Sequence, residues 1–284
     1  MNTVNTNCFN DLVAARWRNG LFLCVGLDTD YAKIAPLFKD ESVSDALFHF
    51  NRAIVEATAE FCCAFKPNSA FYEGYGLAGM EALLRTNRFI REHYPELPII
   101  LDAKRADIGN TNQGYVKAAF EVFGAHAITL HPYLGKEALQ PFLADPNHSV
   151  FVLCHTSNPG AGEFQELTVA GRELYKIVAE RVAREWNANG NCGLVVGATY
   201  PEQLAEVRAI AGDLPLLIPG IGAQGGDLEQ TVRNGLTAAG DGIVINASRS
   251  VLYASSGADF ATAAAAEARR LAEAIRAIGA GNGR

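Results

Sequence analysis

Charged residues follow a short apolar run in the middle of the chain, among them Asp102, Lys104 and Asp107 in that order. Successive side chains of a strand point to opposite faces, so Asp102 and Lys104 point the same way. The preceding run, Pro98 to Leu101, has the composition of a buried parallel strand. Charges at the end of such a strand are costly to desolvate. For Asp102 and Lys104 alone, the simplest interpretation is an ion pair at a strand end.

A repeated unit organises the rest of the chain: a short apolar run, a polar turn and a helical pattern. Eight such units predict a single α/β domain over residues 1–284 with the (β/α)8 TIM-barrel fold, and an open doubly wound sheet is the alternative. The expected strands are Leu21–Leu27, Phe61–Phe65, Pro98–Leu101, Ala125–Leu130, Ser149–Cys154, Cys192–Val196, Pro215–Ile218 and Gly242–Ile245. The expected helices are Asp45–Glu60, Gly79–His93, Thr111–Phe123, Gly135–Leu143, Thr168–Trp186, Pro201–Ala211, Asp227–Asn234 and Ala258–Ile278.

The ends of the chain and of some helices also have interpretable sequences. We interpret residues 1–18 as an N-terminal extension and residues 279–284, rich in Gly and Asn, as a flexible tail. Asp45 and Thr168 are expected N-caps, and Pro201 suits the first turn of a helix.

Composition excludes several classes of partner. The net charge is −7 and no long basic run occurs, which argues against nucleic acid. No apolar run approaches the roughly 20 residues that span a bilayer, and the N-terminus lacks an apolar signal segment, so we expect a cytoplasmic protein without a membrane partner. The 6 cysteines form no C-x-x-C pair, which favours buried reduced thiols over disulfides or a metal site.

Polar residues follow most of the predicted strands. In a barrel of this type the active site lies at the carboxyl ends of the strands. The polar residues at these strand ends include Asp28, Lys66, Asp102, Lys104, Ser157, Ser248 and Arg249, and Pro219 and Gly220 stand at the same level after another strand. Their matched positions predict one functional rim.

A phosphate site is expected after the last two strands, where this barrel commonly binds phosphate. Gly220, Gly222, Gly225 and Gly226 precede a helix, and glycines let a turn present backbone N–H groups while the helix adds its positive dipole end. Arg249, after the next strand, can bind two phosphate oxygens. An ordinary glycine-rich turn is the alternative interpretation.

Four charges of alternating sign are expected at adjacent strand ends: Lys66, Asp102, Lys104 and Asp107. Each ammonium group is then flanked by carboxylates, which keeps both lysines protonated and both aspartates ionised. Such an array can supply positive charge where a carbanion develops, and a proton afterwards.

These charged residues belong to a wider resemblance. Nearly the whole chain resembles the orotidine 5'-phosphate decarboxylase family in its longer bacterial-type form. The resemblance rests on residues 23–28 (LCVGLD), 65–73 (FKPNSAFYE), 101–109 (LDAKRADIG) and 219–227 (PGIGAQGGD). A D-x-K-x-x-D motif alone is less specific, because related sugar-phosphate decarboxylases also carry it. Thr29 stands where a proline commonly follows the aspartate in this family.

The resemblance implies a role for each matched residue and the conversion of orotidine 5'-monophosphate to uridine 5'-monophosphate, the last step of pyrimidine nucleotide synthesis, without metal or organic cofactor. It implies that Lys104 protonates C6 of the pyrimidine and that Asp102 faces the substrate carboxylate. The remaining implied ligands are Lys66 and Asp28 at the ribose, Ser157 at the pyrimidine, and Gln224 and Arg249 at the phosphate, with Pro219, Gly220, Gly222, Gly225 and Ser248 around them.

A homodimer with shared active sites is implied as well, because Asp107, Ile108 and Thr111 match residues that reach into the partner subunit's site. Loop closure over the ligand is a further expectation, with Ser157–Gln165 and Gly222–Asp227 as the candidate loops.

Three other functions remain open. The first is a magnesium-dependent sugar-phosphate decarboxylase or aldolase of the same barrel superfamily. Such enzymes typically have a glutamate where this chain has Lys66, and the positive charge of Lys66 would repel the metal. A Schiff-base aldolase would need Lys104 unprotonated, against the effect of its flanking carboxylates. A non-catalytic nucleotide-phosphate binding barrel has little use for the four charges.

Several histidines and one glutamate receive no catalytic role. We interpret His126 and His131 as structural. His155 lies close to the expected site without a carboxylate partner evident in the sequence, and Glu73 has no assigned chemistry.

Overall fold

A computed structural model describes residues 8–221 and 227–281 of the chain. Eight parallel strands form one sheet in the order β2-β1-β10-β9-β8-β5-β4-β3. Bridges between Phe65 and Ile99 and between Asn68 and Asp102 join β2 to β3 and close the sheet into a barrel. The strands are β1 (Leu23–Gly26), β2 (Cys62–Lys66), β3 (Ile100–Arg105), β4 (Ala127–Leu130), β5 (Ser149–His155), β8 (Cys192–Val196), β9 (Leu216–Pro219) and β10 (Ile243–Ala247).

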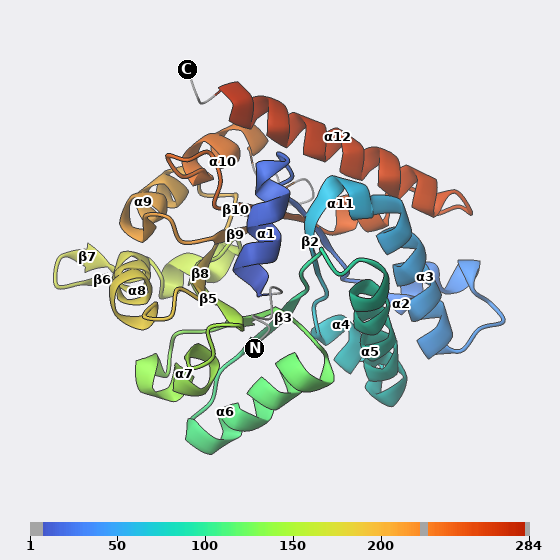
Figure 1. Cartoon of the computed structure of the whole chain (residues 1–284), viewed down its shortest axis with the longest axis horizontal. Helices are drawn as coiled ribbons and strands as arrows, with labels where there is room; N and C mark the ends of the chain where they lie inside the picture. Colours follow the sequence, from blue (N-terminus) through green and yellow to red (C-terminus); the bar gives the residue numbers. More distant parts are fainter. Residues whose placement is uncertain (1–7, 222–226, 282–284) are drawn as a thin grey trace, which may run out of the picture.

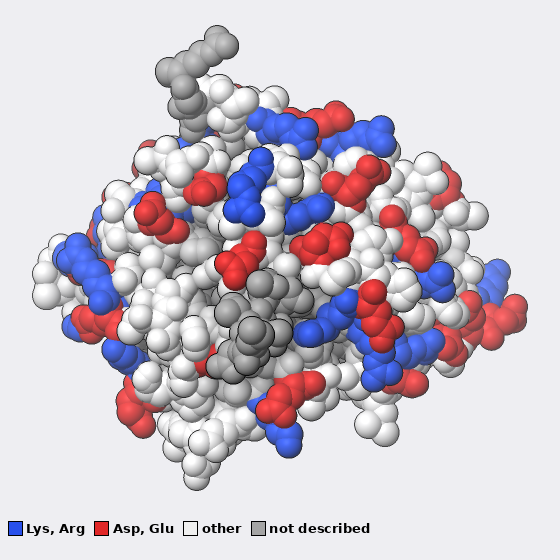
Figure 2. All heavy atoms as spheres, viewed as in Figure 1, with Lys and Arg blue, Asp and Glu red and all other residues white. Residues whose placement is uncertain are grey.

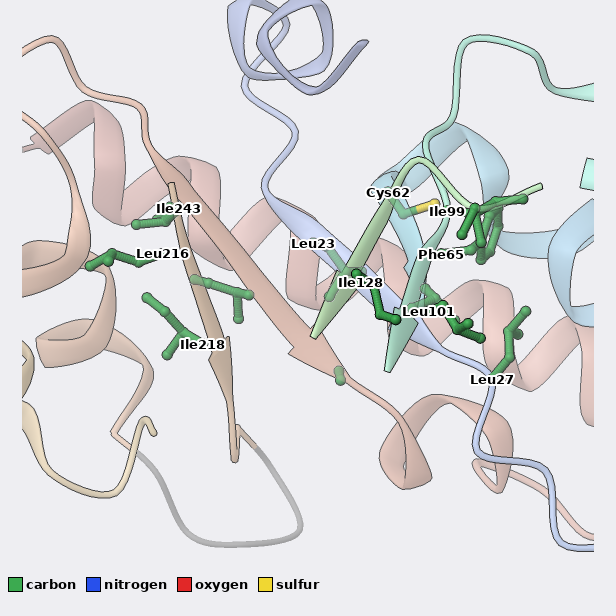
Figure 3. Close-up of a cluster of buried hydrophobic side chains, with 14 of the residues drawn as sticks. Leu23, Leu27, Cys62, Phe65, Ile99, Leu101, Ile128, Leu216, Ile218 and Ile243 are labelled. Carbon is green, nitrogen blue, oxygen red and sulfur yellow. The ribbon is translucent and has the colours of Figure 1, made fainter. Parts of the chain in front are cut away.

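The predicted (β/α)8 TIM barrel is therefore confirmed, and each of the eight expected strands overlaps an observed one. The strands are buried on both faces, so their sequences are continuous apolar runs and do not alternate between apolar and polar residues. Successive apolar side chains point into two different layers. Cys62 packs in the outer layer between barrel and helices, whereas its neighbour Cys63 packs inside the barrel. Figure 3 shows part of the outer layer, with side chains of several strands lying together.

Helices surround the barrel in the order of the chain (Figure 1). Their bounds are α1 (Phe9–Arg18), α2 (Tyr31–Ile34), α3 (Val43–Thr58), α4 (Ala70–Glu73), α5 (Gly76–His93), α6 (Gly109–Val116), α7 (Gly135–Leu143), α8 (Leu174–Arg181), α9 (Pro201–Ala211), α10 (Leu228–Gly235), α11 (Arg249–Leu252) and α12 (Phe260–Ala280). Segments of π-helix over Lys117–Val122 and Val182–Trp186 extend α6 and α8. The last helix, α12, includes Gly279 and Ala280, which the sequence had placed in the tail.

Helix α1, within the expected N-terminal extension, crosses the amino-terminal mouth of the barrel (Figure 1). Phe9 and Val13 enter the inner apolar layer, and the Phe9 ring meets Phe151 edge-on. Arg16 Nε donates a hydrogen bond to the carbonyl of Cys62 at the start of β2, and Trp17 Nε1 donates to the carbonyl of Ile243. Helix α1 thereby covers this end of the barrel.

Two expected N-caps are wrong. Helix α3 is capped by Ser42, whose hydroxyl accepts from the N–H of Asp45, while Asp45 lies inside the first turn. Thr168 starts no helix, because Thr168–Val169 (β6) and Arg172–Glu173 (β7) form a short antiparallel hairpin. The turn Ala170–Gly171 has positive φ at both residues, a conformation typical of a tight hairpin.

The surface carries charges of both signs. On the face seen in Figure 2, Lys and Arg side chains alternate with Asp and Glu, and no large area of one sign is visible. None of the described helices has the length and apolarity needed to cross a membrane.

Candidate active site

Asp102 and Lys104 meet at the carboxyl end of β3, although not through a regular strand. Between the pairs Leu101–Ile128 and Arg105–Leu130 the register shifts, so that three residues of β3 stand against one of β4. This is a β-bulge, and within it Lys104 has φ +46°, in the left-handed region that is uncommon for a residue with a Cβ. Lys104 Nζ donates to Asp102 Oδ1 at 2.6 Å. The same-side placement expected from alternation is thus observed, with a strained backbone that the sequence did not indicate.

Asp102 lies between two ammonium groups. Lys66, at the end of β2, donates from Nζ to Asp102 Oδ2 at 2.7 Å and is buried. Burial opposes the charge on Asp102, but Lys66 and Lys104 outweigh it and hold the pKa of this carboxyl well below its usual range. Burial likewise opposes the charge on Lys66, but Asp102 and Asp28 raise the pKa of that ammonium above its usual value. The geometry therefore keeps both groups ionised at neutral pH.

A cavity that we call the lysine cavity opens above this cluster. Its lining includes Lys66, Asp102, Lys104 and, from the loop after β5, Ser157. The side chain of Lys104 is 48% exposed, so its ammonium group is open to a bound molecule and to water. A second hollow, which we call the arginine cavity, adjoins the first and shares Lys66, Asp102 and Pro219 with it; its lining is Asp28, Lys66, Asp102, Pro219, Gly220, Ile221, Asn246, Ser248 and Arg249. Together the two cavities suit an elongated ligand.

Two buried acceptors face the arginine cavity without a hydrogen-bond donor among the described residues. They are Asp28 Oδ1 and Asn246 Oδ1. The backbone around Asp28 is held in place, because Tyr72 donates to the carbonyl of Leu27 and Tyr253 donates to that of Asp28. A buried acceptor without a donor is costly, so a ligand hydroxyl at this position would be favoured.

The expected phosphate end is partly described. Pro219 and Asn246 are register partners on neighbouring strands, which brings Gly220, with φ +107°, beside Ser248 and Arg249. Arg249 is exposed, and its guanidinium makes no hydrogen bond or ion pair with another described residue. Gly222, Gln224 and Gly225 lie outside the described residues.

Helix α10, which follows the glycine-rich segment of the sequence, has an acidic residue at its N-cap. Asp227 is the N-cap of α10, and its carboxylate accepts from the N–H of Gln230. One N–H group at the amino end of this helix is therefore bonded by a carboxylate of the chain itself. Within the described part of the chain, the positive charge of the arginine cavity comes from Arg249 and Lys66.

Asp107 does not join the other three charges within this chain. Its Oδ1 accepts from the N–H of Ile108, and no ion pair links it to Lys66 or Lys104 in the described residues. Asp107 is partly exposed, Ile108 is 64% exposed and Thr111 is also exposed.

Ser157 is positioned by a loop that is fastened at its base. The N–H of Thr156 donates to Gln165 Oε1 at 2.8 Å, and His155 Nε2 lies 3.0 Å from Glu166 Oε1. His155 thus has a carboxylate partner that the sequence did not reveal. Gly197, on the neighbouring strand end, lies so close that a Cβ there would come within 2.8 Å of Ser157 Cα.

Some residues that line the cavities received no role from the sequence. Thr129 on β4 and Gln165 line the lysine cavity, and Asn246 lines the arginine cavity. Thr129 is a polar position inside an apolar strand, which is a signal that the sequence does contain. Glu73, by contrast, pairs with Arg105 and lines neither cavity. No three His, Cys, Asp or Glu side chains gather as a metal site within residues 8–221 and 227–281.

Residues 22–266 match the model of the orotidine 5'-phosphate decarboxylase / HUMPS family. The chain is 50% identical over 271 residues to an orotidine 5'-phosphate decarboxylase of Azoarcus sp. (strain BH72), which covers 95% of this chain and 98% of that protein. An enzyme of the same name from Ralstonia pickettii (strain 12J) is 50% identical over 269 residues, covering 94% and 96% of the two chains.

Solved structures agree with this match. The OMP decarboxylase of Leishmania donovani has a TM-score of 0.84 and 42% identity, covering 96% of this chain and 99% of that one. A UMP synthase of the same organism has a TM-score of 0.85 and 43% identity, and the matched part is 56% of its length. This chain therefore spans about half of that larger protein.

Proposed function

The chain belongs to the orotidine 5'-phosphate decarboxylase / HUMPS family, and on this premise we propose how it acts on orotidine 5'-monophosphate. It is a carboxy-lyase of pyrimidine nucleotide synthesis. The proposal concerns the mechanism: uridine 5'-monophosphate forms without a metal ion or organic cofactor, through the charges of Lys66, Asp102 and Lys104. The observation that carries it is the hydrogen-bonded row of these three side chains beneath the lysine cavity.

In this mechanism Lys104 acts at the reacting carbon. The bond between C6 and the carboxylate breaks, carbon dioxide leaves, and the electron pair stays on C6. The ammonium of Lys104 stabilises this negative charge as it develops and then donates its proton to C6. Its half-exposed side chain allows it to regain a proton from water.

Asp102 has two effects on the same step. It holds the ammonium groups of Lys66 and Lys104 in place through its two oxygens. It also stands beside the substrate carboxylate, and two such charges about 4 Å apart repel each other by roughly 4 kcal/mol at an effective dielectric constant near 20. This repulsion falls as carbon dioxide departs.

The remaining site residues bind the nucleotide. The unpaired Oδ1 of Asp28 and the ammonium of Lys66 suit the ribose hydroxyls, while Ser157 suits the pyrimidine. Arg249 binds the phosphate, together with Gln224, Gly220, Gly222 and Gly225, while Pro219 and Ser248 lie around it. Binding energy at the phosphate then supports the chemistry at the far end of the cavity.

The active unit in this proposal is a homodimer. Asp107, Ile108 and Thr111 complete the site of the neighbouring subunit, which is consistent with an exposed Ile108 and with the absence of Asp107 from the ion-pair row in the described chain. The fourth charge of the expected array is then supplied by the partner.

A magnesium-dependent sugar-phosphate decarboxylase is the second candidate. Both oxygens of Asp102 are taken by ammonium groups, so a cation would have to displace one of them. This arrangement favours the metal-independent mechanism.

The deciding experiment is a spectrophotometric assay with orotidine 5'-monophosphate, with and without a chelator. We expect equal turnover in both. Activity that disappears with the chelator and returns with magnesium would support the second candidate. Binding of uridine 5'-monophosphate without any turnover of the substrate would contradict the enzymatic assignment.

A further inference from the structure

Thr129 is a buried residue of β4 that lines the lysine cavity. It stands alone opposite the bulge of β3, between the register partners Ile128 and Leu130. Because the bulge places three β3 residues against this single residue, the regular ladder of backbone hydrogen bonds is interrupted there. The N–H of Lys104 is one of the groups that lose a ladder partner and need another acceptor.

The hydroxyl of Thr129 supplies that acceptor. The N–H of Lys104 donates to Thr129 Oγ1 at 2.9 Å. The same oxygen lies 2.9 Å from Asp102 Oδ1. A hydroxyl has one proton to donate, and an ionised carboxylate has none, so Thr129 donates to Asp102 while it accepts from Lys104.

We propose that Thr129 is a positioning residue of the reaction, which fixes the proton donor Lys104 and its carboxylate partner Asp102 relative to each other through one hydroxyl group. This inference rests on the proposed function, because it concerns the geometry of the proton transfer. The hydrogen bond from the N–H of Lys104 to Thr129 also stabilises the strained backbone of Lys104, whose φ is +46°.

The hydroxyl also matters after the proton has moved. Once Lys104 has given its proton to C6, it is neutral, and Asp102 has lost one of its two cationic partners. The hydrogen bond from Thr129 is a charge-assisted bond that remains on Oδ1 through this change. Asp102 therefore keeps its orientation while Lys104 is recharged, and small displacements of reacting groups are costly in rate.

The test compares variants that differ by the hydroxyl. Thr129→Val keeps the shape and removes the hydroxyl, whereas Thr129→Ser keeps the hydroxyl and removes a methyl group. Thr58→Val is the matched control, since Thr58 is a buried threonine of α3 whose hydroxyl donates to the carbonyl of Ile54 on its own helix. Turnover of orotidine 5'-monophosphate, KM, affinity for uridine 5'-monophosphate and melting temperature are measured for each.

We expect kcat of Thr129→Val to fall by about 10- to 100-fold, with KM and product affinity within about threefold of the parent protein. Thr129→Ser recovers kcat to within about threefold, and Thr58→Val leaves kcat unchanged. If the valine variant does not fold, Thr129→Ala and Thr129→Ser make the same comparison. If the parent enzyme is active and kcat is unchanged in Thr129→Val, this inference is overturned and the proposed function is not. An inactive parent would overturn the proposed function instead.

A serine variant as slow as the valine variant would also contradict the inference, because the loss would then follow from packing and not from the hydroxyl.

Discussion

Asp102 binds Lys104 through Oδ1 and Lys66 through Oδ2, so each oxygen of one carboxylate holds one ammonium group. The two lysines differ in their surroundings: Lys66 is buried, whereas the side chain of Lys104 is 48% exposed at the cavity. A proton can therefore be exchanged with ligand or water at Lys104 far more readily than at Lys66. This asymmetry separates the proton donor from the residue that holds the charges in place.

Replacing Lys104 tests the proton donor. In Lys104→Ala we expect kcat for orotidine 5'-monophosphate to fall by on the order of 10⁴-fold, since both the general acid and its positive charge are lost. Binding of uridine 5'-monophosphate, measured by calorimetry, is expected to persist because Arg249 and Asp28 are untouched. Turnover near that of the parent protein would rule out this role for Lys104.

Arg249 tests the phosphate end. Arg249 is exposed, and its guanidinium makes no hydrogen bond or ion pair with another described residue, so Arg249→Ala removes no such interaction from the fold. Loss of a hydrogen-bonded charge on the phosphate is expected to weaken uridine 5'-monophosphate binding by about 10- to 100-fold. The melting temperature serves as the control and is expected to stay within about 2 °C of the parent value. An unchanged affinity would place the phosphate elsewhere.

Mixing two inactive variants tests the shared active site. Lys104→Ala and Asp107→Ala remove groups that, in the proposed dimer, meet from different subunits. After complete subunit exchange of equal amounts, half of the dimers are mixed and each has one intact site, so about one quarter of full activity is expected. Exchange is verified with differently tagged subunits. If exchange is complete and no activity returns, Asp107 serves its own subunit or none.

The buried His126 is expected to make the free energy of unfolding depend on pH. Its buried Nδ1 accepts from the N–H of Ile99, and burial lowers the pKa of His126 to about 4, against about 6.5 when unfolded. The unfolded chain therefore binds more protons between these values, and the free energy of unfolding falls as the pH falls through this window. From pH 6.5 to 4.5 the contribution of this group is a loss of about 2 kcal/mol.

The variant His126→Asn retains an acceptor and does not titrate in this range. We expect its free energy of unfolding, from urea denaturation, to fall by about 2 kcal/mol less than that of the parent protein over the same pH interval. The variant Glu92→Gln, in which an exposed carboxyl of α5 is neutralised, controls for a general change of charge. Equal losses in the parent and the asparagine variant would contradict the prediction.

Much of the fold could be predicted because buried parallel strands are recognisable along the chain. Runs such as Cys192–Val196 need no knowledge of their neighbours to be identified as strands. The helix starts were less predictable. Ser42 and Asp45 are both good capping residues, and which of them caps α3 depends on the path of the preceding chain. The hairpin at Thr168–Glu173 is too short to leave a periodic pattern.

The candidate site was predictable in its residue types and less so in its contacts. Asp28, Lys66, Lys104 and Arg249 were expected at one rim because strand ends of a barrel share a face. The carboxylate partner of His155 was not expected, because Glu166 comes from the far end of a loop. Asp107 was expected in the charge array and, by the resemblance, in the partner subunit's site; within the described chain its carboxylate accepts from the N–H of Ile108.

The order of apolar runs and polar turns in this chain is enough to specify the barrel and to place Asp102 and Lys104 on its functional rim, because period and strand direction are local properties. The bulge of β3, the left-handed backbone of Lys104 and the hydroxyl of Thr129 that links it to Asp102 arise from the pairing of β3 with β4. That pairing joins residues about 25 positions apart, and its register depends on how all eight strands close into one barrel. Contacts of this kind exist only once the chain is folded.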